Sequence, residues 1–129
     1  MPLNPEPYAK TSESSHQIAL FMWASLPEQQ IAYPMLKYMF AIPNGGKRDK
    51  ITGAKLKAEG VKPGVPDIML PIPRSGYHGL FIELKKPVKG KVSDVQEPWH
   101  EVLRALGYRV CVCYGWAEAK EAIIRYLSL

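Results

Sequence analysis

Two acidic residues and a lysine stand at the ends of two apolar segments that are predicted to be neighbouring strands. Asp67 begins the run Asp-Ile-Met-Leu, and Glu83 and Lys85 end the run Leu-Phe-Ile-Glu-Leu-Lys. Residues i and i+2 of a strand point to the same side, so Glu83 and Lys85 are expected to project together. Antiparallel pairing of residues 66–72 with residues 79–85 would place Asp67 beside Glu83.

This arrangement predicts a metal site. Two carboxylates and one backbone carbonyl, for which Leu84 is the candidate, are hard oxygen ligands that suit Mg²⁺ or Mn²⁺. Such an ion would offset the repulsion between Asp67 and Glu83 and lower the pKa of a bound water, and Lys85 would orient that water or stabilise charge on a phosphate. The alternative is structural, because aspartate after proline is common in turns and a Glu-X-Lys strand can carry a solvated ion pair. The apolar neighbours of Glu83 favour the metal site, since an unpaired buried carboxylate costs several kcal/mol.

Three further residues are candidates for the same site. Glu13 opens the first predicted helix and could supply a third metal or water ligand, with Gln17 one turn later on the same face. The alternative for Glu13 is an acid that is favourable at a helix N-terminus. Gln96 could reach the site from a later helix, although it is also the N3 residue of a capping box with Ser93.

The charge of the chain favours a partner that is rich in phosphate. The 129 residues carry a formal net charge of +5, and basic surfaces commonly bind nucleic acid. Two basic runs flank the acidic pair, and lysines in loops with glycine are natural phosphate contacts, although a charged run can also be only a solvated surface. The DNA-binding candidates in these runs are Lys47, Arg48, Lys50, Lys55, Lys57, Lys62, Lys89 and Lys91.

The histidines do not have the spacing of metal ligands, and we interpret His78 and His100 as surface or packing residues. The two cysteines, Cys111 and Cys113, alternate along a predicted strand and are expected to be core thiols on one face, in a reducing cytosol.

No apolar run is long enough to span a bilayer, and residues 1–10 do not resemble a signal peptide. Nothing resembles a phosphate-binding glycine loop, so no nucleotide cofactor is expected.

The elements that position these residues are predicted to alternate between helices and strands. Their order is helix, strand, helix, strand, strand, helix, strand, helix, at about residues 11–26, 38–42, 48–59, 67–70, 78–85, 93–106, 108–114 and 119–127. The segment 66–85 is hairpin-like, and the strand–helix–strand segment 78–114 is expected to be a parallel, right-handed crossover. The predicted fold class is α/β, with a mixed central sheet of about four strands and helices on both faces. Residues 1–10 are predicted to be an extended arm and residues 11–129 a single domain.

Two of these helices have apolar residues at helical spacing. In the first helix, Ile18, Phe21, Met22 and Ser25 are expected to share a face. In the helix after Ser93, the predicted apolar face consists of Val95, Trp99, Val102, Leu103 and Leu106. Pro98 lies beyond the first turn counted from Ser93, which predicts a local bend.

Taken together, these motifs resemble the virus-type replication-repair nuclease (VRR-NUC) domain of the PD-(D/E)XK nuclease superfamily, in its stand-alone phage or bacterial form. The resemblance covers roughly residues 13 to 127. The matching segments are Glu13-X-X-X-Gln17, Ile-Pro-Asn-Gly-Gly-Lys-Arg at 42–48, residues 56–68, Gly-Leu-Phe-Ile-Glu-Leu-Lys at 79–85, residues 90–93 continuing to Gln96 and Trp99, and Gly107-Tyr108-X-Val110.

The resemblance implies a PD-(D/E)XK restriction-endonuclease-like core and metal-dependent cleavage of branched DNA. It implies that Asp67 and Glu83 bind the metal, that Lys85 is the catalytic lysine and that Glu13 is an acid carried by a helix; Asn44, within residues 42–48, is a candidate supporting residue. Stand-alone members look like homodimeric Holliday-junction resolvases of phages or bacteria. The expected partners are therefore branched DNA, above all four-way junctions, and a second copy of the chain. The expected location is the nucleoid region of the cytoplasm.

The predicted function is that of a metal-dependent, structure-selective DNA endonuclease in repair and recombination, most specifically a homodimeric Holliday-junction resolvase. A nickase of flaps and a less selective nuclease are the alternatives within this class. The alternatives from other classes are a non-catalytic DNA-binding module and a structural subunit that acts through its dimer surface, neither of which needs paired acids. No further domain is evident, so substrate selection is expected to come from the nuclease unit and its dimer.

Overall fold

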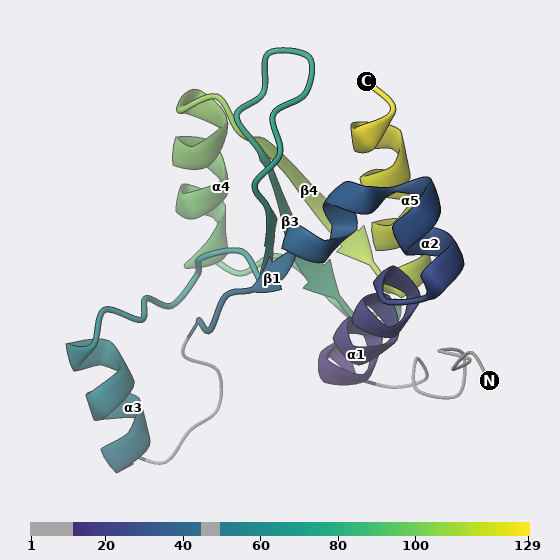
Figure 1. Cartoon of the computed structure of the whole chain (residues 1–129). Coiled ribbons are helices and arrows are strands. Elements are labelled where there is room, and N and C mark those ends of the chain that lie inside the picture. The colour runs from purple at the N-terminus through teal and green to yellow at the C-terminus, as the bar shows by residue number, and fades with distance from the viewer. Residues whose placement is uncertain (1–11, 45–49) are drawn as a thin grey trace.

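The chain forms five α-helices, one 3-10 helix and four strands within the part that the structure describes. The computed structural model describes residues 12–44 and 50–129, without the side chain of Lys50. The elements in chain order are α1 (Glu13–Ala24), α2 (Pro27–Ala32), the 3-10 helix η2 (Pro34–Tyr38), β1 (Phe40–Ala41), α3 (Lys50–Ala58), β2 (Ile68–Leu70), β3 (Leu80–Lys85), α4 (Gln96–Ala105), β4 (Arg109–Tyr114) and α5 (Trp116–Leu127) (Figure 1). The arm predicted for residues 1–10 lies outside the described residues.

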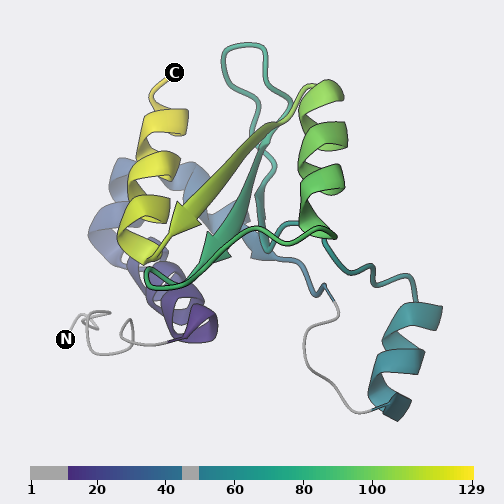
Figure 2. The same ribbon diagram turned by 180° about the vertical axis from the view of Figure 1, so that it is seen from behind.

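The strands form one mixed sheet, as the sequence predicts. Their order is β1-β2-β3-β4, with β1/β2 and β2/β3 antiparallel and β3/β4 parallel. The sheet lies between two helical layers, with α4 on one face and α1 and α5 on the other (Figure 2). The predicted α/β fold class is therefore confirmed, including helices on both faces of the sheet.

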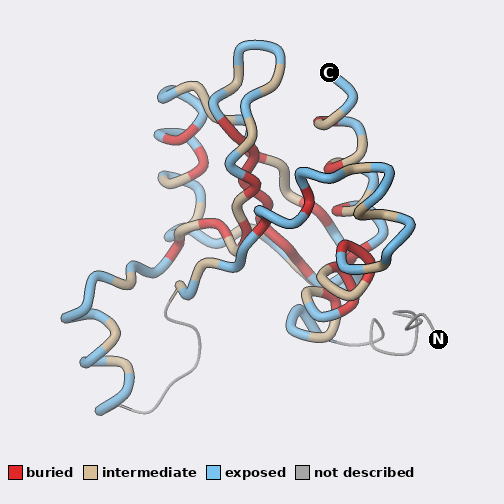
Figure 3. Tube along the Cα trace, viewed as in Figure 1, coloured by how far each residue is buried: buried red, intermediate tan, exposed pale blue. Residues whose placement is uncertain are grey.

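The core is divided between the two faces of the sheet. The larger apolar cluster joins α1 and α5 to the sheet through fully buried side chains such as Leu20, Ile82 and Ile123. A smaller cluster lies under α4 and contains Phe81 and Leu103 with neighbouring half-buried residues. Figure 3 shows the buried positions concentrated on the strands and on the inner sides of the helices. Alternate residues of β3 thus serve both layers, as expected for a strand covered on both faces.

The cysteines of β4 behave as predicted. Cys113 is buried in the larger cluster, and Cys111 is half-buried against it. Burial raises the pKa of the Cys113 thiol to about 12. Cys113 is therefore an uncharged core residue at neutral pH.

The predicted buried face of α1 is wrong. The helix begins after Ser12, its N-cap, whose side chain accepts a hydrogen bond from Ser15 N–H. Its buried residues are His16, Ala19, Leu20, Trp23 and Ala24, whereas Ile18 is 51% exposed. Because α1 is apolar around most of its circumference, the spacing of apolar residues alone could not select the face that meets the sheet.

The predicted face of α4 is also largely wrong. Among its residues, His100 and Leu103 are buried, while Val102 is 46% exposed and Leu106 is 60% exposed. The helix also begins at Gln96, so Pro98 is its third residue and stands in the first turn, where a missing N–H costs no intrahelical bond.

The first strand is shorter than predicted, and α3 stands apart from the sheet. Residues 34–38 form η2, which leaves β1 with two residues, but Ile42 N–H still donates to Asp67 O at 2.7 Å. Figures 1 and 2 both show α3 projecting away from the sheet and the other helices. The helix ends at Ala58, and Gly60 follows with φ +98°, a conformation that glycine adopts readily. Among the described residues, no helix has the length and apolar character needed to cross a bilayer.

Candidate active site

The antiparallel register of β2 and β3 sets Asp67 opposite Glu83. Ile68 pairs with Ile82 and Met69 with Phe81, so the next position in the same register pairs residues 67 and 83. Phe81 packs under α4, and Glu83, two residues further along β3, points to the same face of the sheet. The two acids therefore meet on the face of the sheet that α4 covers, at the start of β2.

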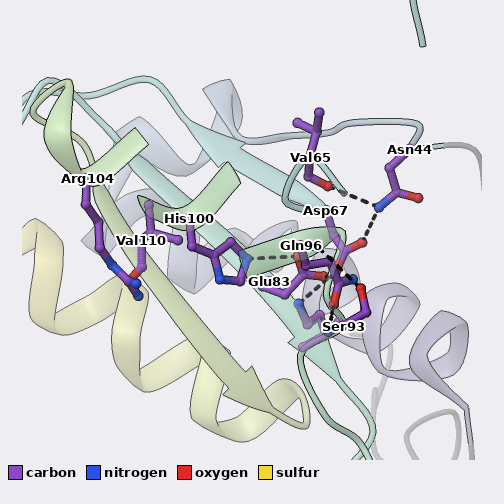
Figure 4. A network of polar contacts seen from close by, with 10 residues as sticks. Asn44, Val65, Asp67, Glu83, Ser93, Gln96, His100, Arg104 and Val110 are labelled. Carbon is purple, nitrogen blue, oxygen red and sulfur yellow. Dashed lines mark hydrogen bonds and ion pairs between the residues drawn. The ribbon is translucent and has the colours of Figure 1, made fainter. Parts of the chain in front are cut away.

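Both oxygens of the Asp67 carboxyl group accept hydrogen bonds. Asn44 Nδ2 donates to Oδ1 at 2.8 Å, and Leu84 N–H donates to Oδ2 at 2.7 Å (Figure 4). Gly64 allows the preceding segment to pass close to α4, because its φ is +91° and a Cβ atom there would collide with the Val95 backbone and the Trp99 ring. The carboxyl group of Asp67 is thus held by Asn44, which follows β1, and by the backbone of β3.

The carbonyl of Leu84 is directed toward the same place. In a strand, the N–H and C=O of one residue point to the same side, and Leu84 N–H points to Asp67. The carbonyl of the next residue, Lys85, points the other way and accepts from Gly115 N–H at 2.8 Å. The Leu84 carbonyl therefore faces the side of β3 on which Asp67 lies, as its predicted role requires.

Glu83 is a fully buried acid. Its side chain has an exposed fraction of 0%, and it contacts Gln96 Nε2 through Oε2 at 3.1 Å and His100 Nε2 through Oε1 at 3.2 Å. Burial, followed by the hydrogen bond and the negative charge of Asp67, raises the pKa of Glu83 to about 9, against the opposing effect of Lys85. Without a cation, Glu83 is therefore protonated at neutral pH.

Gln96 performs both of the roles that the sequence suggested for it. Its Oε1 accepts from Ser93 N–H at 2.9 Å, and its own N–H donates to Ser93 Oγ at 3.3 Å. These are the two reciprocal bonds of a capping box, formed here across the turn that leads into α4 at Gln96. The amide nitrogen of the same side chain donates to Glu83. The start of α4 and the carboxyl group of Glu83 are thus held by one side chain.

Lys85 brings a positive charge to the acidic pair. It is only 6% exposed, and its side chain projects to the same face as Glu83 because it stands two residues further along β3. Its charge lowers the pKa of Glu83, in opposition to burial. Because Lys85 is buried, little solvent screens the attraction between its ammonium group and the carboxyl groups.

Two pockets meet at Asp67. One has a volume of about 330 Å³ and is lined by Glu13 and Gln17 of α1 together with Asn44, Asp67 and Leu84. The other, of about 290 Å³, shares Glu13, Asn44 and Asp67 and extends to Gln96. Asp67 and the predicted supporting residues Glu13, Gln17, Asn44 and Gln96 therefore line these openings, whereas Glu83 and Lys85 are buried behind them and line neither pocket.

Glu13 stands at this opening, and its charge helps to raise the pKa of Glu83. Over residues 12–44 and 50–129, no three or more His, Cys, Asp or Glu side chains are grouped so that they could hold a metal ion. A ligand role for Glu13 therefore stays a prediction, as does the ligand set of Asp67, Glu83 and the Leu84 carbonyl.

Five of the predicted DNA-contacting residues can be assessed in the described part of the chain. Lys47 and Arg48 are outside the described residues, and Lys50 begins α3. The other five are exposed: Lys55 and Lys57 on α3, Lys62 between α3 and β2, and Lys89 and Lys91 between β3 and α4. Their exposure leaves them available to phosphate groups, while the role itself stays a prediction.

His100 is the site residue that the sequence interpretation missed. It is 3% exposed and contacts Glu83 rather than serving as an ordinary surface or packing residue. Burial, followed by the charges of Arg104 and Lys85, lowers the pKa of His100. Its spacing of four residues from Gln96 was the available signal, because residues i and i+4 share a helix face.

The comparisons with known proteins agree with this geometry. The family model of the VRR-NUC domain matches residues 11–117. The chain belongs to the VRR-NUC domain family. VRR-NUC proteins are nucleases that act on DNA and are typically metal-dependent. A solved structure described as a VRR_NUC domain protein has 29% sequence identity and a TM-score of 0.77, with coverage of 93% of this chain and 91% of that chain. No curated protein matches the chain.

Proposed function

We propose that this VRR-NUC domain is a metal-dependent endonuclease that hydrolyses phosphodiester bonds in branched DNA. The observation that carries the proposal is the pairing of Asp67 with the buried Glu83, beside a buried lysine. Binding DNA requires positive charge but does not require two acids held together at the cost of burying one of them. The pairing therefore supports hydrolysis over a module that only binds DNA.

The donor set fits Mg²⁺ or Mn²⁺. Mg²⁺ commonly takes one or two carboxylates from the protein and completes its shell with water and substrate phosphate oxygens, and Asp67, Glu83 and the Leu84 carbonyl offer such a set. Once bound, the ion would lower the pKa of a coordinated water and draw charge from the scissile phosphate. The protonated Glu83 of the metal-free protein must lose its proton for this to happen.

Other residues of the site would orient Asp67, position the attacking water and stabilise the developing charge. Asn44 and the Leu84 N–H hold the carboxylate of Asp67 in one orientation. Lys85 would orient the attacking water or stabilise the negative charge that develops on the phosphate. Glu13 and Gln17 line the larger pocket, from which they would hydrogen-bond to water next to the reacting group.

The finer proposal is a Holliday-junction resolvase that works as a homodimer. A two-fold axis would set two such sites on opposite strands of a four-way junction, which would produce paired symmetric nicks. The exposed lysines stand on two separate elements, α3 and the loop after β3, which supports contact with more than one stretch of DNA backbone. Nicking of flaps, or less selective cleavage, is the alternative for the same chemistry.

The test compares three DNA substrates in the presence and absence of metal. A synthetic four-way junction, a flap and a plain duplex are incubated with the protein and Mg²⁺, Mn²⁺ or a chelator. The proposal expects paired nicks in the junction with metal and none in chelator. Preferential cutting of the flap would replace the resolvase with a nickase, and cutting that persists in chelator would remove the metal mechanism. Light scattering should give a dimer mass, and a monomer at micromolar concentration would count against the resolvase.

A further inference from the structure

We propose that His100 is a positioning residue for Glu83, which orients the carboxyl group of Glu83 toward the cation without touching the cation itself. The inference rests on the proposed function, in which Glu83 is a metal ligand. It concerns a residue outside the acid–lysine motif, carried by α4 at the i+4 position from Gln96.

The hydrogen bonds of the site form a regular set. Besides the hydrogen bond between the two acids, each of the four carboxyl oxygens of Asp67 and Glu83 has a partner outside the pair, at distances from 2.7 Å to 3.2 Å. The four partners are Asn44, Leu84, Gln96 and His100. Glutamate has one more rotatable bond than aspartate, so a single contact through Oε2 would leave the plane of its carboxyl group free to rotate. The second contact, through Oε1 to His100, fixes that plane.

The direction of this hydrogen bond follows from the chemistry of the two groups. A carboxylate that binds a metal is ionised and can only accept hydrogen bonds. His100 Nε2 must therefore carry the proton and donate it to Oε1, which is the arrangement by which outer groups orient metal ligands in proteins.

His100 is placed to act through Glu83 and not on the cation. Figure 4 shows Glu83 between His100 on one side and Asp67 and Asn44 on the other. His100 is 3% exposed, and its hydrogen bond in the site is to Glu83 Oε1, at 3.2 Å. Within the described part of the chain, Asp67, Glu83 and His100 do not form a three-ligand metal group.

Packing alone does not account for an imidazole at this position. Leu103 and Phe81 are buried in an apolar cluster beside α4, and Trp99 packs against it, so a leucine at position 100 could extend that cluster. A buried imidazole, by contrast, must find a hydrogen-bond partner. The partner it has is Glu83.

The test measures the affinity of the protein for Mn²⁺ alone, without DNA, from the electron paramagnetic resonance signal of free Mn²⁺. His100→Leu removes the donor, and removal of such an outer hydrogen bond typically weakens metal binding by about 10- to 100-fold. His100→Gln retains an N–H donor near the position of Nε2 and should bind Mn²⁺ nearly as well as the wild type. In DNA cleavage, His100→Leu should need more Mn²⁺ but recover most of its rate when the metal is saturating.

A second buried histidine provides the matched control. His16 is 4% exposed, and its Nδ1 accepts a hydrogen bond from Trp116 N–H at 3.0 Å. His16→Leu should lower the melting temperature in chelator and leave the Mn²⁺ dissociation constant unchanged. Melting temperatures in chelator establish that each variant is folded at the temperature of the binding assay.

The outcomes separate the two proposals. If the wild type binds Mn²⁺, Glu83→Gln abolishes that binding and His100→Leu binds as tightly as the wild type, the positioning role is wrong and the metal site stands. The positioning role is also wrong if His100→Gln is as defective as His100→Leu, because the donor would then not be what matters. If Glu83→Gln binds Mn²⁺ as the wild type does, the proposed metal site fails and the role of His100 fails with it.

Discussion

Replacing Glu83 with glutamine should remove a large part of the pH dependence of stability in the metal-free protein. Burial raises the pKa of Glu83 from its ordinary value of 4.5 to about 9. Between these values the folded state keeps a proton that the unfolded state has lost. Stability from this group is therefore fully present below pH 4.5 and is lost as the pH rises toward 9.

The size of this pH dependence follows from the difference in the number of protons bound by the folded and unfolded states. One proton held only by the folded state changes the free energy of unfolding by about 1.4 kcal/mol per pH unit. Between pH 7 and pH 8 the wild type should therefore lose about 1.4 kcal/mol more than Glu83→Gln, whose amide does not titrate. Domains of this kind have total stabilities of about 5–15 kcal/mol, so the difference is well within measurement.

The assay is urea unfolding followed by tryptophan fluorescence in chelator, at pH 7.0, 7.5 and 8.0. The wild type and Glu83→Gln share all other titrating groups, so the difference between their slopes isolates position 83. Parallel stability curves would refute the protonated state of Glu83. Mn²⁺ at 100 times its dissociation constant should then stabilise the wild type by about 2.7 kcal/mol and leave Glu83→Gln unchanged.

Three further outcomes are expected. Lys85→Ala should lower the cleavage rate by about 10²- to 10³-fold, the usual effect of removing one group that stabilises transition-state charge, and leave junction binding intact in a gel-shift assay; cleavage at the wild-type rate would remove Lys85 from the mechanism. Replacing Lys55 and Lys57 together with alanine should reduce the slope of log K against log salt by about 0.9 for each phosphate group that the variant no longer binds, whereas an unchanged slope would make both lysines solvated surface. Cys113, with its pKa raised to about 12 by burial, should resist a thiol reagent at pH 8 until the protein is unfolded in urea, and rapid labelling of the native protein would contradict its burial.

The sheet could be predicted from the sequence because its strands carry strong local signals. The runs before and after the turn at residues 71–76 are apolar on both sides, which marks strands covered on both faces. Their antiparallel pairing then fixed the partner of Asp67, since a register in which Ile68 meets Ile82 carries residue 67 to residue 83. The acid pair and its neighbour Lys85 were therefore predictable from strand geometry.

The faces of the helices could not be predicted in the same way. The apolar residues of α4 indicated a face that includes Val102 and Leu106, yet the face that meets the sheet carries Gln96 and His100. A buried carboxyl group needs polar partners, and apolar periodicity cannot detect a helix face that is polar for that reason. His100 was missed because its partner Glu83 is distant in sequence and only the folded chain brings the two together.

The most direct test of the central claim is a crystal structure with Mn²⁺, in which anomalous scattering locates the ion. The account predicts an ion about 2.0–2.2 Å from oxygens of Asp67, Glu83 and the Leu84 carbonyl, with Lys85 beside it and His100 still hydrogen-bonded to Glu83. An ion bound elsewhere would contradict the account, and so would a Glu83 side chain that remains hydrogen-bonded to Asp67 in saturating Mn²⁺.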